Sequence, residues 1–407
     1  MDIGQNERFI KKNDFLPKIV STSIAVRRLK TVVGLHPCNL GDNLMTFFLP
    51  AATFVVFPVS NPRKALTKCF FAAMNSKTTL PALLIAALIF ISATTIFAQS
   101  RPVSFFERLT PEEGVTLTLS TDVSALIANK YNAEYQPAKL TTREGRTYEL
   151  QVKSRGKFRR KIAEIPPLKL KVKKKVLEAE GLDTLNEVKL VLPCFLDKRG
   201  DDLVVREYLA YRMFEQLTDK SVRARLVDLT LLNTGAGNAA KYQVKAILLE
   251  DEEETVARLD GQLVDFFGMT TDSLQTEQAA LTALFQYMIG NTDWNIAEQR
   301  NVRFVRTKAG ELLMIPFDFD FAGFVNAPYA TPNADTGLKN IKDRYLMSDK
   351  LGAPALESAY RTMQALRQAF NQICQSSFVS PEDAAKLVEY LDSFYAKPGK
   401  NEKVSFR

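Results

Sequence analysis

The sequence predicts an α+β protein with two lobes, the first rich in strands and the second rich in helices. From Phe105 onward, short segments such as Val115–Ser120 alternate between apolar and polar residues at period two, as half-buried strands do. Later the apolar residues recur at helical spacing, most clearly in Thr276–Gly290. The chain has 407 residues, of which 46% are hydrophobic and 25% charged, as in ordinary soluble proteins. We expect a β-rich lobe over residues 99–250 and a helix-rich lobe over residues 251–407.

Residues 74–98 have the features of a secretory signal peptide. The basic Lys77 precedes an apolar run, Leu80–Phe97, and Ala98 precedes a polar start. The run of about 18 residues is at the lower limit for a membrane span, and Ile96 stands where a cleavage site usually has a small residue. An uncleaved anchor is therefore the alternative to cleavage after Ala98. We expect an exported protein, periplasmic or at the cell surface, with no stable membrane span after cleavage.

The leader also accounts for the basic charge of the chain. Residues 1–73 precede the signal and are interpreted as an unstructured extension from an upstream start. Residues 1–98 hold 11 basic and 4 acidic residues, whereas residues 99–407 hold 43 and 42, so the formal charge of +8 predicts no nucleic-acid partner. The single histidine, His36, lies in the leader. The exported part therefore excludes Ser-His-Asp catalysis and a His-ligated zinc site.

Two cysteines, Cys194 and Cys374, follow the signal. In an exported protein they could form a disulfide. Two free, buried thiols are the alternative, and the sequence leaves both open.

The elements follow from periodicity and turn residues. We expect strands at Val115–Ser120, Pro137–Leu140, Arg146–Lys153, Ile165–Lys173, Val188–Pro193, Arg225–Leu232 and Tyr242–Leu249. Gly145 and Gly235–Asn238 mark turns between them. We expect helices at Ser124–Asn129, Asp202–Leu217, Thr276–Gly290, Ala355–Phe370 and Pro381–Tyr395. The acidic run Glu250–Glu254 is interpreted as the first turn of a further helix, where it favours the helix dipole.

One predicted strand carries a row of lysines. A basic turn, Ser154–Lys161, precedes it, and Lys169, Lys171 and Lys173 share one face, because alternate residues of a strand point the same way. One interpretation of this row is an exposed lysine face that protects an edge strand from aggregation.

The stretch Tyr287–Phe324 holds the polar residues around which the rest of the chain is organised. It contains the turn Asn291–Asn295, Asn301, a short β-ribbon, and the pair Asp318 and Asp320. Apolar residues flank both aspartates, and burying a carboxylate is costly unless a cation compensates it. On a strand the two carboxylates would share one face. We expect a metal ion or a lysine beside them; the alternative is a solvated strand end with two capping aspartates.

These motifs together resemble the CotH kinase family (spore coat protein H-like), which are secreted, atypical protein kinases. The resemblance runs from Thr147 to Phe324 and is strongest at Asn291-Thr-Asp293 and at Ile315–Asp320. It implies a two-lobed, protein-kinase-like fold. It also implies transfer of the γ-phosphate of ATP to Ser or Thr hydroxyls of a protein substrate, with Mg²⁺ or Mn²⁺.

The resemblance implies a role for each matching acidic or amide residue. Asp293 would orient or deprotonate the acceptor hydroxyl. Asn301 and Asp318 would bind the metal ion, with Asp320 as a second candidate ligand. Oxygen ligands of this kind suit Mg²⁺ or Mn²⁺ rather than zinc.

The resemblance also implies how the nucleotide would be bound. Lys169 would contact the phosphates, with Lys171 as the alternative on the same face. Arg155 and Gly156 would form the turn over the phosphates. Glu207, on the helix that follows, would pair with the lysine.

The sequence departs from the family pattern in two places. Trp294 follows the catalytic-loop aspartate where the family commonly has a basic residue or histidine, and Asn301 comes later than the expected asparagine pair, so Asn295 is an alternative ligand. Lys157 and Phe158 replace small polar residues after the Arg-Gly pair. These departures leave a catalytically weak pseudokinase, or an assembly scaffold of the cell envelope, as the second hypothesis.

A third hypothesis is a glycan hydrolase that uses Asp293 and Asp318 as its pair of carboxylates. The lysine strand would have no role in such an enzyme. The kinase hypothesis is therefore preferred from the sequence.

Overall fold

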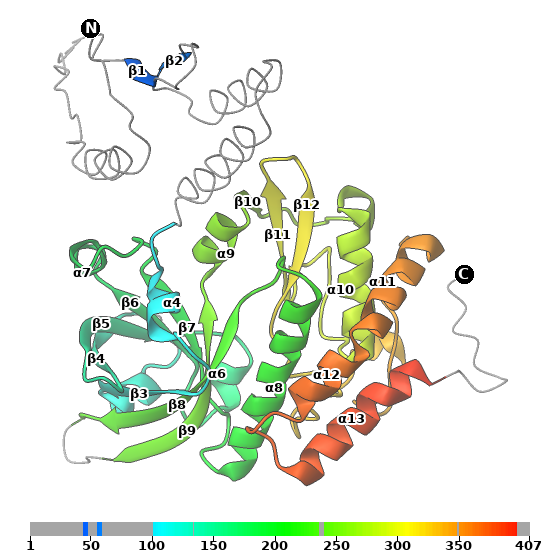
Figure 1. Cartoon of the computed structure of the whole chain (residues 1–407). Helices are drawn as coiled ribbons and strands as arrows, with labels where there is room; N and C mark the ends of the chain where they lie inside the picture. The colour runs from blue at the N-terminus through cyan, green and yellow to red at the C-terminus, as the bar shows by residue number, and fades with distance from the viewer. Residues whose placement is uncertain are drawn as a thin grey trace, which may run out of the picture. The chain divides into compact units, whose positions relative to one another are not determined.

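The structure is a computed structural model that describes residues 44–47, 55–58, 101–132, 134–235, 240–347 and 350–396 (Figure 1). The chain divides into two compact units, Met1–Ser100 and Arg101–Arg407. In the first unit, strands β1 (Leu44–Phe47) and β2 (Val55–Pro58) form an antiparallel pair. The predicted signal peptide and its cleavage site lie outside the described residues. Within the described part of the chain, no helix has the length and apolar character needed to cross a bilayer.

Seven strands of the second unit close into a barrel in the order β3-β4-β5-β6-β7-β9-β8. They are β3 (Val115–Thr121), β4 (Gln136–Thr142), β5 (Thr147–Ser154), β6 (Leu168–Val172), β7 (Glu187–Val191), β8 (Ala224–Asn233) and β9 (Lys241–Glu250). Neighbouring strands pair antiparallel except β3 and β8, which run parallel with Val115 opposite Val227. Alternate apolar residues of the strands, among them Leu119, Leu150 and Leu170, fill the interior.

The predicted two-lobed, kinase-like fold is therefore wrong. The strands expected to form an open lobe close into a barrel, and residues 101–407 form one compact unit. Closure depends on the parallel pairing of β3 with β8, which joins segments about a hundred residues apart. The sequence pattern shows which residues of a strand are buried, but it carries no local signal for such a pairing.

The beginning of β8 and the end of β9 are buried on both faces and connect the barrel to the helices. Val227 and Leu248 point into the barrel, whereas Leu226 and Ile247 pack in a second core with the helix α8 (Lys198–Leu217). Figure 1 shows α8 between the barrel and the C-terminal helices. The apolar run at the end of β9 follows from this burial on both sides.

A second sheet and further helices complete the unit. The sheet has the order β10-β11-β12, with β10 (Gly261–Val264), β11 (Val302–Thr307) and β12 (Leu312–Pro316) pairing antiparallel. The other helices are α4 (Phe105–Leu109), α5 (Val123–Ala128), α6 (Arg159–Ile162), α7 (Lys174–Ala179), α9 (Glu252–Arg258), α10 (Thr276–Met288), α11 (Ala353–Ala365), α12 (Arg367–Cys374) and α13 (Pro381–Tyr395), with 3-10 turns η1 (Thr271–Ser273) and η2 (Ala334–Thr336).

Most predicted elements are present with shifted ends. α8 begins at Lys198 rather than Asp202, because the side chain of Asp197 caps it by accepting from the Gly200 amide. The helix expected from Ala355 is divided into α11 and α12 at Leu366. Cys194 and Cys374 are free, buried thiols and form no disulfide, which was one of the two outcomes expected for them.

Candidate functional site

The ends of β11 and β12 bring the loop residues of the predicted site together. Asn301 directly precedes β11 and Phe317 directly follows β12, and the Phe317 amide donates to the Asn301 carbonyl over 3.0 Å. The Asn301 side-chain amide donates to the backbone carbonyl of Asp293 at 2.6 Å and to its carboxylate Oδ2 at 2.9 Å. This use of the NH₂ group leaves the Asn301 side-chain oxygen available to a ligand.

Two residues of this site have a left-handed backbone. Asn301 has φ at 53° and Asp318 has φ at 62°. Such a conformation is unfavourable for residues other than glycine, and it concentrates at functional sites. The Asp318 amide donates to the Tyr211 hydroxyl at 2.8 Å, which fixes the backbone there. The expectation that Asp318 and Asp320 share one face of a strand is wrong, because β12 ends at Pro316 and the chain then turns.

Asp318 lacks, among the described residues, the hydrogen-bond partners that Asp293 and Asp320 have. Its carboxylate accepts no hydrogen bond from any residue that the structure describes. Burial raises its pKa to about 6, and the negative charge of Asp320 adds to this effect, whereas Arg159 and Arg155 act in the opposite direction. A half-buried carboxylate in this state is favourably placed to bind a cation.

Asp320, in contrast, is paired with an arginine through one of its oxygens. Arg159 Nε donates to Asp320 Oδ2 at 2.8 Å, and its Nη2 donates to Glu207. All three side chains are buried. Burial also raises the pKa of Glu207 to about 8, although the charge of Arg159 opposes it. The expected pairing of Glu207 with a lysine is therefore not formed, because Arg159 takes that position.

The lysine strand is β6, which lies between β5 and β7 in the barrel. Lys169 Nζ contacts Glu187 Oε2 at 2.5 Å and Asp251 Oδ2 at 3.1 Å, and Lys171 Nζ contacts Glu187 Oε1 at 2.8 Å. Burial acts to lower the pKa of Lys169, but its bonds to Glu187 and Asp251 outweigh this and raise it. The register places Lys169 directly between Lys153 and Lys189, an arrangement of like charges that requires these acidic partners.

Arg155 connects the lysine face to the aspartates. It follows β5, its amide donates to the Pro167 carbonyl at 2.8 Å, and its guanidinium has no ion-pair partner in the described part of the chain. Burial dominates the pKa of both Asp318 and Lys189, and the charge of Arg155 contributes to each. A single guanidinium is thus within electrostatic range of both halves of the predicted site. Gly156 has φ at 83° and open space around it, as a turn over a ligand requires.

Asp293 is positioned by three neighbours. Its amide donates to the Asn291 side chain at 3.0 Å, Asn301 donates to its carboxylate, and Arg300 lies 3.5 Å from Oδ1. Burial raises its pKa, while Arg300 opposes that shift. Asn295, the alternative ligand, instead accepts from the Glu298 amide within its own turn.

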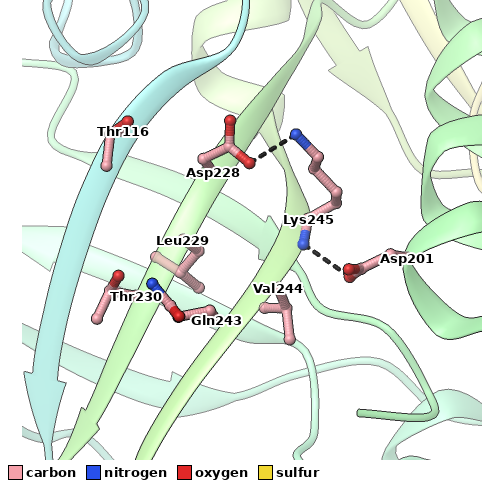
Figure 2. A pocket seen from close by; sticks show the side chains of 8 residues that line it. All are labelled: Thr116, Asp201, Asp228, Leu229, Thr230, Gln243, Val244 and Lys245. Carbon is pink, nitrogen blue, oxygen red and sulfur yellow. Dashed lines mark hydrogen bonds and ion pairs between the residues drawn. The ribbon is translucent and has the colours of Figure 1, made fainter. Parts of the chain in front are cut away.

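Two hollows lie outside these residues. Figure 2 shows one of about 410 Å³ on the outer face of β3, β8 and β9. There the Lys245 ammonium pairs with Asp228 at 2.6 Å, and the Lys245 backbone amide donates to Asp201 at 2.7 Å. The charged side chains that line this hollow therefore already have partners. The second, of about 480 Å³, is lined by residues of α8 that include Arg199 and Arg206, together with Asn326 and Pro328.

Sequence reasoning missed three residues of the site. Arg159 was visible only as part of a basic turn, and nothing in the sequence marked it as the partner of Glu207. Tyr211 supports Asp318 from the middle of an apolar helix face, where a tyrosine has no distinguishing pattern. Arg300 adjoins Asp293 through a turn whose shape the sequence does not specify.

The residues of the site suit a divalent ion only if phosphates and water supply the other oxygens of its coordination shell. No group of three histidine, cysteine, aspartate or glutamate side chains in the described ranges is arranged to hold a metal. Asp318 and the free oxygen of Asn301 supply two donors. Mg²⁺ is commonly bound in this way, by one or two protein oxygens together with phosphates and water.

No protein-family model matches this chain, and no curated protein matches it. The resemblance found in the sequence therefore stays a prediction, and the function is argued from the site.

Proposed function

We propose that this chain is an exported kinase that transfers the γ-phosphate of ATP to a protein hydroxyl. The observation that carries the proposal is the carboxylate of Asp318, which is half-buried, raised in pKa and without a hydrogen-bond donor among the described residues. It follows Phe317, whose amide bonds the Asn301 carbonyl, and it lies within range of the Arg155 charge. A two-lobed fold is no part of the proposal, since one chemistry recurs on unrelated folds.

The metal ligands would be Asp318 and the Asn301 side-chain oxygen. Arg159 holds Oδ2 of Asp320, so Oδ1 is the oxygen that this carboxylate could offer to the ion. A bound Mg²⁺ or Mn²⁺ would neutralise charge on the phosphates. The unpartnered Asp318 carboxylate is the group that such an ion would satisfy.

The phosphates would lie against Arg155 and the lysine face. This face carries more basic than acidic side chains: Lys153, Lys169, Lys171, Lys189 and Arg155 against Glu187, Asp251 and Glu252. Arg155 and Lys153 are cations of this face without an ion-pair partner among the described residues, although Lys153 lies over the Tyr135 ring at 4.4 Å. The adjoining Gly156 lets the backbone approach a ligand closely. An excess of positive charge around a free guanidinium suits a triphosphate.

Asp293 would act on the acceptor hydroxyl. Its raised pKa makes it a better proton acceptor, and Asn301 holds its carboxylate in place. In the proposed reaction the hydroxyl oxygen forms a bond to the γ-phosphorus, the bond from that phosphorus to the β,γ-bridging oxygen breaks, and ADP leaves. The hydroxyl proton passes to the Asp293 carboxylate.

The test uses radiolabelled ATP with Mn²⁺, and measures label in the protein itself and in casein as a general acceptor. We expect Asp318→Ala to abolish incorporation, because it removes the proposed metal ligand. Asp335→Ala, which changes an exposed aspartate of a loop, should leave incorporation unchanged.

A thermal-unfolding titration separates binding from transfer. Mn²⁺-ATP at 100 times its Kd should add about 2.7 kcal/mol to the free energy of unfolding of the wild type. Equal incorporation by Asp318→Ala and the wild type would refute the assignment. Stabilisation without transfer in the wild type would replace the kinase by a nucleotide-binding pseudokinase.

A further inference from the structure

An exposed aromatic ring stands at the entrance to the proposed site. Phe158 follows the turn of Arg155 and Gly156, and 42% of its surface is exposed. Its ring centroid lies 5.0 Å from that of Phe321 and 5.9 Å from that of Tyr329. This phenylalanine, edge-on to Phe321 and tilted to Tyr329, leaves a substantial part of its apolar surface exposed.

The neighbours of Phe158 connect it to the proposed site. Arg159, the next residue, bonds Asp320, and Phe321 directly follows Asp320. Asp293, proposed to act on the acceptor hydroxyl, lies instead on the loop after α10 with Asn301 and Arg300 as neighbours. The ring is therefore placed on the nucleotide side of the site.

The aromatic cluster is linked to the hollow beside α8 through Arg199 and Pro328, although none of the four rings lines it. The ring of Phe195 lies 6.3 Å from that of Tyr329, and the guanidinium of Arg199 lies 4.0 Å above Phe195. Arg199 and Pro328, the neighbour of Tyr329, both line the hollow of about 480 Å³. The space that adjoins the rings is of a size typical for small-molecule ligands.

We propose that Phe158 stacks against the purine base of the nucleoside triphosphate, with Phe321 and Tyr329 supporting its ring. The inference rests on the proposed function, because it takes the phosphates to lie at Arg155. Phe158 lies three residues after Arg155. Three residues of chain span at most about 10 Å, which is on the order of the distance from the base to the outer phosphates of one nucleotide. Stacking on an aromatic ring tolerates any base, so ATP and GTP should both use it.

The experiment compares ligands with and without a base. Calorimetry in Mn²⁺ gives the Kd of ATP, GTP and inorganic tripolyphosphate for the wild type, Phe158→Ala and Phe158→Trp. We expect Phe158→Ala to weaken ATP and GTP about tenfold, which is ~1.4 kcal/mol, and to leave tripolyphosphate unchanged. Phe158→Trp should retain the wild-type affinity, since tryptophan offers a larger stacking face.

The control is Phe267→Ala, which removes another exposed ring, 76% exposed, and should change no Kd. If Phe158→Ala leaves ATP affinity unchanged while the wild type binds tripolyphosphate, the base does not lie on this ring, and the proposed function stands. Equal weakening of ATP and tripolyphosphate would mean that the variant disturbs the Arg155 turn and would overturn the inference. A wild type that binds neither ligand overturns both proposals.

Discussion

At Asp318 the backbone is left-handed and the side chain is half-buried among charges of both signs. Neither feature stabilises the fold. Asp318 therefore destabilises the folded state, as strained residues of binding sites commonly do. The pKa of Asp318, raised from 3.8 to about 6, makes this cost measurable.

We expect Asp318→Asn to stabilise the ligand-free protein at neutral pH. A raised folded-state pKa means that the folded state binds the proton more tightly than the unfolded state does. The wild type therefore loses stability as pH rises from about 4 to about 6, and the loss is complete above that range. The asparagine variant does not titrate there, so its advantage should be near zero at pH 4 and reach up to roughly 3 kcal/mol at pH 7.5.

Urea unfolding of both proteins in EDTA at the two pH values measures this difference. Asp335→Asn, on an exposed loop, serves as the control and should show no pH-dependent gain. A stability difference between the Asp318 variant and the wild type that is the same at both pH values would show that Asp318 is not destabilised by burial.

At the same scale, the sequence identified some site residues but not their partners. Asn301 and Asp293 were predicted to act together, and the structure joins them by a hydrogen bond of 2.9 Å. Glu207 was expected beside a lysine, but Arg159 takes its place. A pattern of residue types indicates which side chains are unusual; it does not specify which of several basic residues approaches a given carboxylate in space.

Among the elements, β12 shows how the aspartate segment is held. One edge of the strand pairs with β11, and the other is closed by a side chain of α10: Gln278 donates to the Met314 carbonyl at 2.6 Å and accepts from the Met314 amide at 2.9 Å. The helix thus replaces a further strand. This contact fixes the distance between α10 and the strand that leads to Asp318.

We expect Gln278→Ala to lower the free energy of unfolding by about 2 kcal/mol. The variant leaves the buried Met314 amide without an acceptor, which costs ~1–3 kcal/mol, whereas the carbonyl keeps its bond from Thr282 at 3.3 Å. Thr276→Ala, at an exposed position of the same helix, should change stability by less than about 0.5 kcal/mol. Equal denaturation midpoints for Gln278→Ala and the wild type would contradict the role of this side chain.

The elements themselves were more predictable than their assembly. The strand pair β8 and β9 was expected from two apolar runs around a glycine-rich turn, and the structure pairs them in that way. The short strand β10 and the helical turn α6 gave no periodic signal, because each is only four residues long. The change of direction after Pro316 was missed for a similar reason: a left-handed aspartate looks, in sequence, like one more residue of a strand.

At the scale of the whole molecule, the second core joins the barrel and the helices into one cooperative unit. This core contains Leu226 and Ile247 of the barrel strands together with residues of α8 and of the C-terminal helices. Separating a strand lobe from a helix lobe would therefore expose the core to solvent. Residues 101–407 accordingly form one unit. A two-lobed molecule would instead carry separate cores joined by a small interface.

We expect this unit to unfold in a single transition. Trp294 is the only tryptophan, is 2% exposed and packs beside Val302 and Phe304 of the small sheet, so its fluorescence reports on the aspartate half of the molecule. Far-UV circular dichroism reports on the barrel and the helices together. Because the shared core couples them, urea titrations of a chain beginning at residue 99 should give the same midpoint and slope by both probes. Two separated midpoints, with the fluorescence change confined to one of them, would restore the two-lobed description that the closed barrel contradicts.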